Sequence, residues 1–340
     1  MTTIQQFSGD DATWNAYVDA AGSSTFCHVA GWRGIMADVL GHETFSLVAR
    51  DDHGEWQGVL PLVRVRSPIF GHFLVSMPFL NAGGPIGAPG AVRALANWAQ
   101  AEARRSGADL LELRSRAPVD GDVTRSDRKI TVHRELPADT TLLWTSFPSK
   151  LRSQIRRPQK EGFEPRFGLD QRDAFYEVFA RDMRSLGTPV LPRALFDRLA
   201  SVFPDAVEFG VVYRGEQPIA AGCGFMWRNE FEMVWASSLR EFRRQAPNML
   251  LYWSFMQRMI ERGIGIFDFG RCSPGGNTHA FKRQWGGSDI ALPWAQWSRG
   301  EMTATPTPTR PIFRAAAACW KRLPLSIANR LGPVIAVRIP

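Results

Sequence analysis

The residues best suited to chemistry lie in one segment, residues 267–287, which reads FDFGRCSPGGNTHAFKRQWGG. A strand ending near Asp268 would open here into a glycine-containing loop, and binding sites of α/β proteins often lie in such loops. Asp268 could act as a general base, or it could form an ion pair with Arg271 that orients the guanidinium or only closes the strand end. Lys282 could offer positive charge to a tetrahedral intermediate. These three side chains are the catalytic candidates.

The same segment offers groups that could bind a substrate. Backbone N–H groups at Gly275 and Gly276 could face an anion. His279 could exchange a proton, or it could be an ordinary hydrogen-bonded surface histidine. Trp285 could line a pocket, or it could belong to the core. These four residues are candidates for substrate binding.

Residues 149–162, SKLRSQIRRPQKEG, form a second candidate, a basic helix. Ser149 is expected to cap its N-terminus, and Pro158 is expected to kink or end it. Arg152 and Arg156 lie one turn apart on one face. Such a face could bind a diphosphate or an RNA backbone in a salt-sensitive way.

The positive charge of the chain is concentrated in two segments. The 340 residues carry a net charge of +8. Residues 150–166 contribute +4 and residues 299–340 contribute +6, so the remainder is slightly negative at −2. A focused charge favours an anionic partner, although a solvated face is the alternative for both segments.

The candidate residues must be positioned by strands and helices, and the chain repeats one order of elements. Residues 44–66 and 208–227 each predict a β-hairpin, with turns at residues 51–54 and 214–216. A helix, a glycine and a short strand follow each hairpin. The repeat indicates that the two halves have related folds.

Glycine and asparagine mark the ends of the two helices. The first helix is predicted over residues 91–106, with Gly107 as its C-terminal stop. The second is predicted to begin at Asn248, as the cap, and to end before Gly263.

The strands that follow these helices carry matching carboxylates, Glu112 and Asp268. This suggests duplication, although hairpin, helix and strand is also a common order in α/β proteins. Either way, an α/β fold with α+β-type mixed sheets and helices on their faces is predicted. Residues 81–90 are expected to be a loop, residues 116–129 an exposed polar turn, and residues 303–311 an extended linker.

Several classes of protein are disfavoured by what the sequence lacks. The four cysteines lie far apart, which argues against a zinc site and a disulfide framework, and no metal site is expected. G-x-S-x-G, Walker and H-E-x-x-H motifs are absent, as are a secretory signal and an apolar run of about 18 residues. We expect a reduced, cytoplasmic protein. The other histidines show no metal-binding spacing: His28, His42, His53, His72 and His133.

These motifs resemble those of a known family. The run IFDFGRCSPGGNTHAFKRQWGG resembles the end of the acetyltransferase-like (GNAT-type) domain of FemAB-related proteins, and SKLRSQIRRPQKEGF resembles the basic segment that opens that domain. The stretch from Cys27 to Gly87 and the tail WKRLPLSIANRLGPVIAVRI look like the two ends of FemAB-like proteins associated with PEP-CTERM and exosortase (XrtA) systems. The resemblance covers nearly the whole chain.

The resemblance implies two tandem GNAT-like domains, at residues 1–140 and 141–298. A proline-containing linker and a basic amphipathic tail would follow at residues 299–340. The second domain would carry the chemistry, with Lys282 at the position of the family's functionally important lysine. Arg152 and Arg156 would lie near the phosphates of the substrate, and the same substrate-binding set would include Asn248 and Tyr252.

The resemblance also implies an activity. FemAB relatives transfer an amino acid from aminoacyl-tRNA to an amine of a lipid-linked peptidoglycan precursor, and other GNAT proteins use thioesters of CoA or a carrier protein. We expect an N-acyltransferase or aminoacyltransferase that acts on a cell-envelope or exopolysaccharide precursor, with no tightly bound cofactor and no DNA partner. The glycines of the acetyl-CoA motif R/Q-x-x-G-x-G/A are missing where this chain reads RRQAPNML, which favours aminoacyl-tRNA or another carrier.

Two further expectations concern the membrane as a partner and an alternative function. The +6 tail is expected to rest on anionic lipid at the inner face of the membrane, where a lipid-diphosphate-linked acceptor would lie. The alternative function is a non-catalytic scaffold for polysaccharide assembly. The missing glycine motif favours the scaffold, whereas the joint presence of Asp268, Arg271 and Lys282 favours the enzyme.

Overall fold

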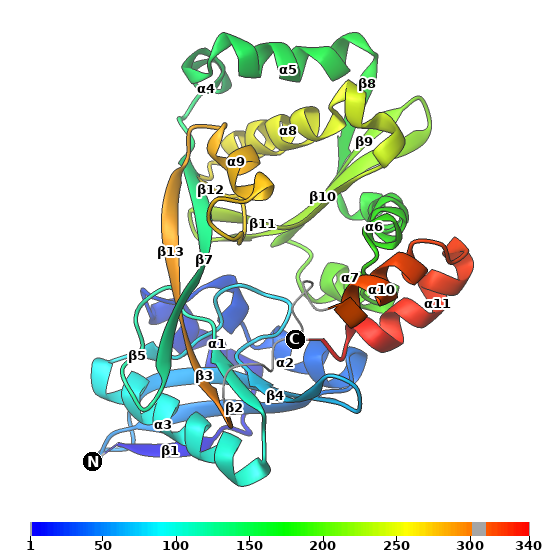
Figure 1. Cartoon of the computed structure of the whole chain (residues 1–340). Helices are drawn as coiled ribbons and strands as arrows, with labels where there is room; N and C mark the ends of the chain where they lie inside the picture. Colours follow the sequence, from blue (N-terminus) through cyan, green and yellow to red (C-terminus); the bar gives the residue numbers. More distant parts are fainter. Residues whose placement is uncertain (1, 301–310, 340) are drawn as a thin grey trace. The chain divides into compact units, whose positions relative to one another are not determined.

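The computed structural model describes residues 2–300 and 311–339, which form two compact units (Figure 1). The first unit comprises Met1–Ile130, Ala291–Thr307 and Val337–Pro340. The second comprises Thr131–Ile290 and Pro308–Ala336. Each unit has a mixed β-sheet with helices against it, which confirms the predicted fold class.

The sheet of the first unit combines antiparallel and parallel neighbours. β2 and β3 form the predicted hairpin, β4 and β6 are parallel, and β13 runs antiparallel to β6. The short β5 (Ile86–Gly87) pairs with β3 beside this path. In spatial order the strands are β1 (Thr3–Gln6), β2 (Glu43–Arg50), β3 (Trp56–Ser67), β4 (Gly71–Val75), β6 (Leu110–Leu113) and β13 (Ser288–Ser298).

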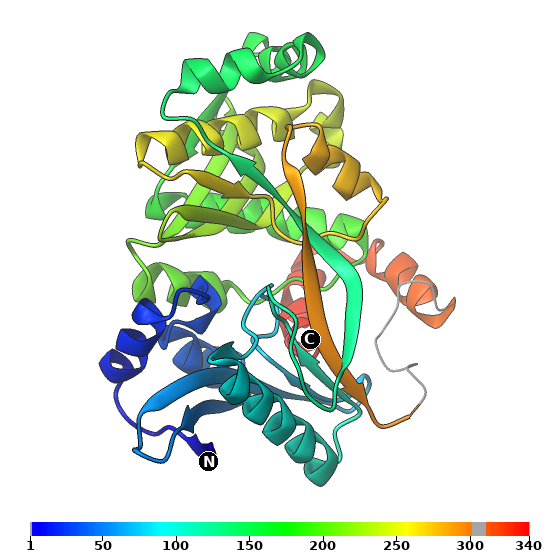
Figure 2. The ribbon, with the colours of Figure 1, turned by 90° about the vertical axis from the view of Figure 1, so that its left-hand side faces the viewer.

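Helices cover both faces of this sheet because its strands are apolar on both sides. α3 (Pro89–Ser106) lies across β2 and β3, where it packs on Leu47 and Leu62 (Figure 2). Their strand neighbours Ser46 and Val63 line a small cavity with Trp14 and Trp32, which Leu62 also touches. These tryptophans belong to the N-terminal helices, which are α1 (Asp11–Ala20), η1 (Phe26–His28), α2 (Gly31–Gly34) and η2 (Ile35–Val39).

The second unit repeats this sheet pattern. β9 and β10 form the second predicted hairpin, β11 and β12 are parallel, and β7 runs antiparallel to β12. In spatial order the strands are β8 (Phe163–Phe167), β9 (Val207–Arg214), β10 (Gln217–Trp227), β11 (Glu230–Ser238), β12 (Ile266–Asp268) and β7 (Thr124–Glu135).

Helices also cover both faces of the second sheet. The ring of Phe209 on β9 contacts Phe175 of α6, whereas a Cβ atom at the adjacent Gly210 would lie 2.6 Å from Phe255 of α8. Because neighbouring strand residues point to opposite faces, α6 and α8 lie on opposite sides of the sheet. The helices are α4 (Thr140–Ser146), α5 (Ser149–Lys160), η3 (Leu169–Gln171), α6 (Arg172–Leu186), α7 (Arg193–Val202), η4 (Arg240–Gln245), α8 (Pro247–Glu261), α9 (Asn277–Arg283), α10 (Pro311–Trp320) and α11 (Leu325–Ala336).

The predicted repeat is present in both units. α3 and α8 follow the hairpin strands and lead to β6 and β12. Gly107 and Gly263, after the two helices, both have a φ of 73°, a left-handed conformation that glycine adopts without strain. The helix of the first half begins at Pro89, slightly before the predicted residue 91.

The strands next to β6 and β12, which are β13 and β7, come from distant parts of the chain. β7 spans the end of the predicted exposed turn at residues 116–129, so that expectation is wrong for residues 124–129. The segment is mostly polar and lacks the apolar alternation of a half-buried strand. β7 and β13 each contribute residues to both units, so the compact units are not the contiguous stretches 1–140 and 141–298.

Three local predictions about helix ends are wrong. The N-cap of α8 is Ala246, and Asn248 is its second residue. The N-cap of α5 is Pro148, and Ser149 is its first residue. α5 continues to Lys160, so the buried Pro158 does not end the helix near Arg157.

The C-terminal tail forms helices where the structure describes it. Most of the predicted linker at residues 303–311 lies outside the described residues. α10 and α11 then pack on the second unit, where the guanidinium of Arg184 donates to the carbonyl of Leu323 at 2.9 Å. Among the described residues, no helix has the length and apolar character needed to cross a membrane.

Candidate functional site

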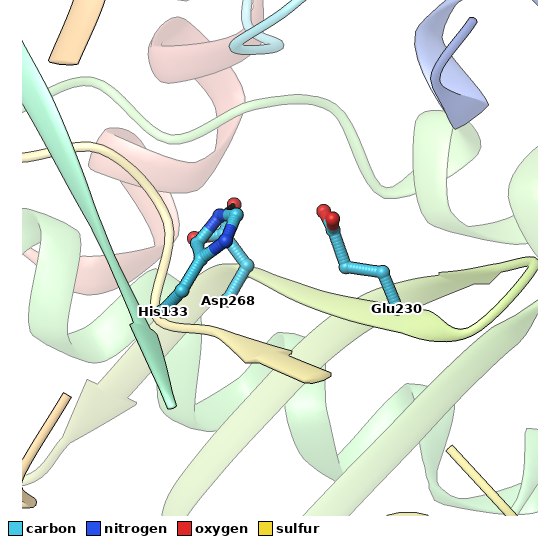
Figure 3. Close-up of side chains that lie close together, drawn as sticks. All are labelled: His133, Glu230 and Asp268. Atoms are coloured by element: carbon cyan, nitrogen blue, oxygen red, sulfur yellow. Dashed lines mark hydrogen bonds and ion pairs between the residues drawn. The ribbon is translucent and has the colours of Figure 1, made fainter. Parts of the chain in front are cut away.

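The carboxylate of Asp268 lies opposite a histidine that the sequence motifs did not include. In the antiparallel pair β7–β12, Asp268 is the register partner of His133. The His133 Nε2 atom lies 3.1 Å from Asp268 Oδ2. The close-up shows the imidazole beside this carboxylate (Figure 3). Asp268 is 1% exposed, whereas the side chain of His133 is 19% exposed. The imidazole is therefore the member of the pair that an external molecule can reach.

The other oxygen of Asp268 is held from two sides. The hydroxyl of Thr131 and the backbone N–H of Gly270 both donate to Oδ1, the latter at 2.7 Å. Two donors favour the ionised carboxylate. An ionised Asp268 can accept from Nε2–H of His133, fix the ring and stabilise the imidazolium. The arrangement suits proton transfer at His133 with Asp268 as its positioning residue.

Sequence reasoning missed His133 because its partner lies far away in the chain. The two residues are separated by 135 positions, and the pairing depends on β7, which was in part read as a turn. The apolar Ile130 and Val132 that precede His133 could have indicated a strand. Nothing local indicates that this strand would join β12.

Glu230 at the start of β11 adds a second carboxylate to this neighbourhood. One donor atom each from His133, Glu230 and Asp268 lies within 4.8 Å of the others. Imidazole and carboxylate oxygens are ligands that zinc and manganese accept, so this group could hold a divalent ion. In Figure 3 the Glu230 carboxylate stands apart from the closely paired His133 and Asp268.

Lys282 is buried and holds the loop that follows β12. Its Nζ atom donates to the carbonyl of Gly270 at 2.5 Å and to that of Arg271 at 3.0 Å. Burial lowers the pKa of the Lys282 ammonium, and the nearby charge of Asp268 partly offsets this. The structure thus brings Lys282 and the Arg271 backbone together beside Asp268, with the amine directed at the main chain.

His279 stabilises the next part of the loop through two hydrogen bonds. The N–H of Gly275 donates to His279 Nδ1 at 3.0 Å, so Nε2 carries the proton and donates to Asp289 Oδ1 at 3.0 Å. Gly275 has a φ of 75°, and Gly276 is the N-cap of α9. His279 therefore fixes the glycine turn that was predicted to face an anion.

Tyr252 and Trp285 lie inside the second unit. The Tyr252 ring stacks on Phe269 with a centroid distance of 5.6 Å, and Trp285 is fully buried beside both. Burial raises the pKa of the Tyr252 hydroxyl. Tyr252 and Trp285 therefore form an aromatic cluster with Phe269, the residue that follows Asp268. The burial of Trp285 agrees with its interpretation as a core residue.

The remaining candidates lie on α5 and α8, which pack against each other. The guanidinium of Arg156 lies over the Trp144 ring at 5.1 Å, and Arg152 is half-buried one turn earlier. The Oδ1 atom of Asn248 is buried without a hydrogen-bond partner among the described residues. These three residues belong to helices, whereas the His133–Asp268 pair lies on strands.

The first unit has a different arrangement at the equivalent place. Glu112 on β6 has Gln296 on β13 as its register partner, and the Gln296 amide donates to it at 2.7 Å. The buried guanidinium of Arg114 donates to the other oxygen of Glu112 at 2.8 Å. An amide and a paired guanidinium do not exchange protons near neutral pH. The imidazole at this position belongs to the second unit.

Comparisons with known sequences and structures identify proteins that this chain resembles. Residues 146–283 match the model of the acetyltransferase (GNAT) domain family. The crystal structure of FemX matches with a TM-score of 0.66 at 13% identity, over 86% of this chain and 97% of that one. No curated protein sequence matches the chain.

Two further solved structures cover nearly all of their own chains. A tandem GNAT protein from the clavulanic acid biosynthesis pathway matches with a TM-score of 0.56 at 13% identity, over 88% of this chain and 99% of that one. L-PGS from Bacillus licheniformis matches with a TM-score of 0.55 at 12% identity, over 92% and 98%. At such identities the likeness establishes the fold, which is the tandem GNAT fold expected from the sequence.

Proposed function

We propose that this protein is an N-acyltransferase or aminoacyltransferase and that the second unit carries the reaction. The observation that supports this most is the His133–Asp268 pair, a partly exposed imidazole held by a buried carboxylate. The pair lies beside the loop that Lys282 and His279 fix, and Asp268 falls within the matched GNAT domain.

The chemistry would proceed by attack of an amine on an activated carbonyl. The amine nitrogen bonds to the carbonyl carbon, the C–S or C–O bond of the donor breaks, and the leaving thiolate or alkoxide takes up a proton. The nitrogen loses its own proton to the imidazole of His133, while Asp268 stabilises the resulting imidazolium. General-base transfer of this kind contributes roughly 100-fold or more to the rate.

The donor we propose is an acyl thioester of CoA or a carrier protein, or an aminoacyl-tRNA. η4 occupies the segment directly before α8, and Ala246 adopts a left-handed φ of 56° where the acetyl-CoA motif would have a glycine. This favours a donor other than acetyl-CoA. The structural similarity to FemX and L-PGS supports the inclusion of an aminoacyl donor in the proposal.

The acceptor we propose is an amine of a cell-envelope or exopolysaccharide precursor, including one linked to a lipid diphosphate. The resemblance to FemAB-related proteins of PEP-CTERM/XrtA systems supports this class. Arg152, with its exposed neighbours on α5, provides positive charge in the same unit as the His133–Asp268 pair.

Peripheral contact with the inner face of an anionic membrane is part of the proposal. Ile327, Leu331 and Val334 are spaced on one face of α11 and are 44%, 46% and 54% exposed. Arg330 on the same helix is also exposed. An apolar stripe beside basic residues suits shallow insertion among anionic headgroups.

A transfer assay tests the enzyme. The full chain is incubated with acetyl-CoA, palmitoyl-CoA or lysyl-tRNA as donor and with UDP-glucosamine as acceptor, and acylated product is measured by mass spectrometry. We expect product with the wild type and a loss of about 100-fold or more with His133→Gln. His53→Gln, at an exposed turn, is the matched control and should leave the rate unchanged.

The alternative function is a non-catalytic scaffold for polysaccharide assembly. The buried Lys282 amine, which donates to two backbone carbonyls, favours it, because such an amine holds a loop without touching a substrate. A scaffold would keep its cellular role in a folded His133→Gln variant, whereas the enzyme would lose it.

A further inference from the structure

The His133–Asp268 pair and Glu230 form a group that the proposed proton transfer uses only in part. One donor atom from each lies within 4.8 Å of the others, and all three residues belong to the second unit. They come from neighbouring strands, since β7 pairs with β12 and β12 pairs with β11. Figure 3 shows the three side chains on the same face of the sheet. Proton transfer requires His133 and Asp268 but gives Glu230 no role.

The spacing of the paired donors suits a metal ion. Zinc binds imidazole nitrogen and carboxylate oxygen at about 2.0–2.2 Å, so two ligands of a tetrahedral ion lie about 3.3 Å apart. His133 Nε2 and Asp268 Oδ2 lie 3.1 Å apart. These two atoms are therefore already at the spacing of two ligands of one ion, without movement of either strand.

Glu230 supplies the third ligand. It is half-buried at the start of β11, and its carboxylate stands further from the other two side chains (Figure 3). A glutamate side chain has three rotatable bonds, so rotation of the side chain rather than a shift of the backbone brings the oxygen to the ion. Three protein ligands and one water molecule complete a four-coordinate zinc site.

The carboxylate of Asp268 is held from behind, as the ligands of metal sites usually are. The Thr131 hydroxyl and the Gly270 N–H both donate to Oδ1, the latter at 2.7 Å, while Oδ2 lies next to the imidazole of His133. Groups that hold a ligand in this way are worth about 10–100-fold in metal affinity. The orientation that an ion requires is therefore built into the fold of β7 and the loop after β12.

The charge around this group favours a cation. Glu232 follows Glu230 by two residues on β11, which places both on one face, and it is the register partner of Asp268. Glu232 is 7% exposed, so its carboxylate adds negative charge where solvent screens little. The ammonium of Lys282 interacts with the charges of Asp268 and Glu232 and offsets part of this negative charge.

We infer that His133, Asp268 and Glu230 together bind a zinc ion. One imidazole nitrogen and two carboxylate oxygens suit zinc, whereas magnesium prefers six oxygens. Zinc on Nε2 of a neutral imidazole leaves the ring proton on Nδ1, so the ring has no free nitrogen to accept a proton. Zinc therefore inhibits transfer through His133. This consequence rests on the proposed function, whereas binding of the ion does not.

Equilibrium dialysis against zinc sulfate tests the site on the full chain, after metal has been removed with EDTA. We expect saturable binding that magnesium in about tenfold excess does not displace. Glu230→Gln and His133→Gln should each weaken it by about tenfold or more, because each removes a ligand. Glu261→Gln removes the same charge from an exposed position of α8 and is the matched control. It should stay within about twofold, because salt screens exposed charges.

Cobalt(II) shows whether these side chains bind the ion directly. Cobalt accepts the same ligands as zinc, and a four-coordinate cobalt ion absorbs visible light far more strongly than the hydrated ion. We expect this absorption with the wild type and Glu261→Gln, and its loss with Glu230→Gln and His133→Gln, all shown to be folded by thermal unfolding. The inference is overturned if the wild type binds no zinc, or if Glu230→Gln and Glu261→Gln bind it equally.

Transfer rates separate this site from the proposed function. Zinc should slow the wild type by about tenfold or more relative to its own metal-free rate. Zinc binding that depends on Glu230 and leaves the rate unchanged would support the metal site and contradict proton transfer at His133. If the chain shows no transfer activity, the proposed function fails, and the dialysis still decides whether the metal site exists.

Discussion

The imidazole of His133 depends on Asp268 in two physical respects. The carboxylate accepts from Nε2–H and so fixes the ring, and its negative charge favours the protonated ring after proton uptake. Thr131 and Gly270 hold the carboxylate in turn. A residue that is 1% exposed cannot meet a substrate directly, which is why we assign proton transfer to His133 rather than to Asp268.

The ammonium of Lys282 should stabilise the folded protein through its hydrogen bonds to the loop after β12. Lys282→Met removes the donor for the Gly270 and Arg271 carbonyls while keeping much of the side-chain volume. The loss of these bonds should lower the free energy of unfolding by about 1–3 kcal/mol. Urea denaturation measures it, with the exposed Lys160→Met as control. Equal stability of Lys282→Met and the wild type would contradict the role of Lys282 in holding the loop.

Acidic pH should lower the free energy of unfolding through the protonation of His28, which lies in the first unit. Its folded-state pKa is about 4, below the ordinary 6.5, so the unfolded chain binds a proton that the folded chain does not over this range. The free energy of unfolding should therefore fall as the pH falls from about 6.5 to about 4, by about 3 kcal/mol in total.

Denaturation at several pH values measures this contribution of His28. His28→Gln should flatten the pH dependence over that range by about one proton, whatever its effect on absolute stability. The exposed His53→Gln should leave the slope as it is in the wild type. An unchanged slope in His28→Gln would show that the histidine is protonated in the folded state.

At the scale of elements, local signals predicted the two hairpins and the long helix that follows each of them. Gly107 and Gly263 end their helices because each takes a left-handed conformation that the sequence itself suggests. β7 was missed because its pairing with β12 depends on residues more than 100 positions away and its own pattern is polar. Because the pairing of β7 was missed, His133 was missed as a site residue, although its partner Asp268 lies in a recognisable motif.

The exposed face of α11 should govern membrane contact. Deleting the whole tail would also remove α10 and the contact between Arg184 and Leu323, so point variants are the sharper test. The triple variant Ile327→Ser, Leu331→Ser and Val334→Ser changes only exposed positions of α11 and leaves its buried face intact. Sedimentation with vesicles of phosphatidylglycerol and phosphatidylcholine should show binding reduced by about tenfold or more.

Two controls separate insertion from charge. Ile69→Ser removes an exposed apolar side chain from the first unit and should leave vesicle binding unchanged. Arg330→Gln should weaken binding to anionic vesicles by about fivefold and leave binding to pure phosphatidylcholine as it was. Equal sedimentation of the triple variant and the wild type would rule out this face as the contact.

At the scale of the whole molecule, the two units share a sheet pattern but differ at one pair of strand positions. The carboxylate on the strand after the long helix faces Gln296 in the first unit and His133 in the second. In the first unit the buried Arg114 neutralises Glu112 as well. The paired imidazole and carboxylate lie in the second unit, which is why we assign the proposed proton transfer to that unit.

Complementation by two mirrored variants tests the central claim most directly. A strain from which this gene has been deleted receives His133→Gln, which gives the second unit the amide of the first, or Gln296→His, which does the reverse. Thermal unfolding first establishes that both variants are folded. We predict that Gln296→His restores the wild-type phenotype and that His133→Gln does not. Full restoration by folded His133→Gln would contradict the claim that the second unit transfers an acyl group through His133.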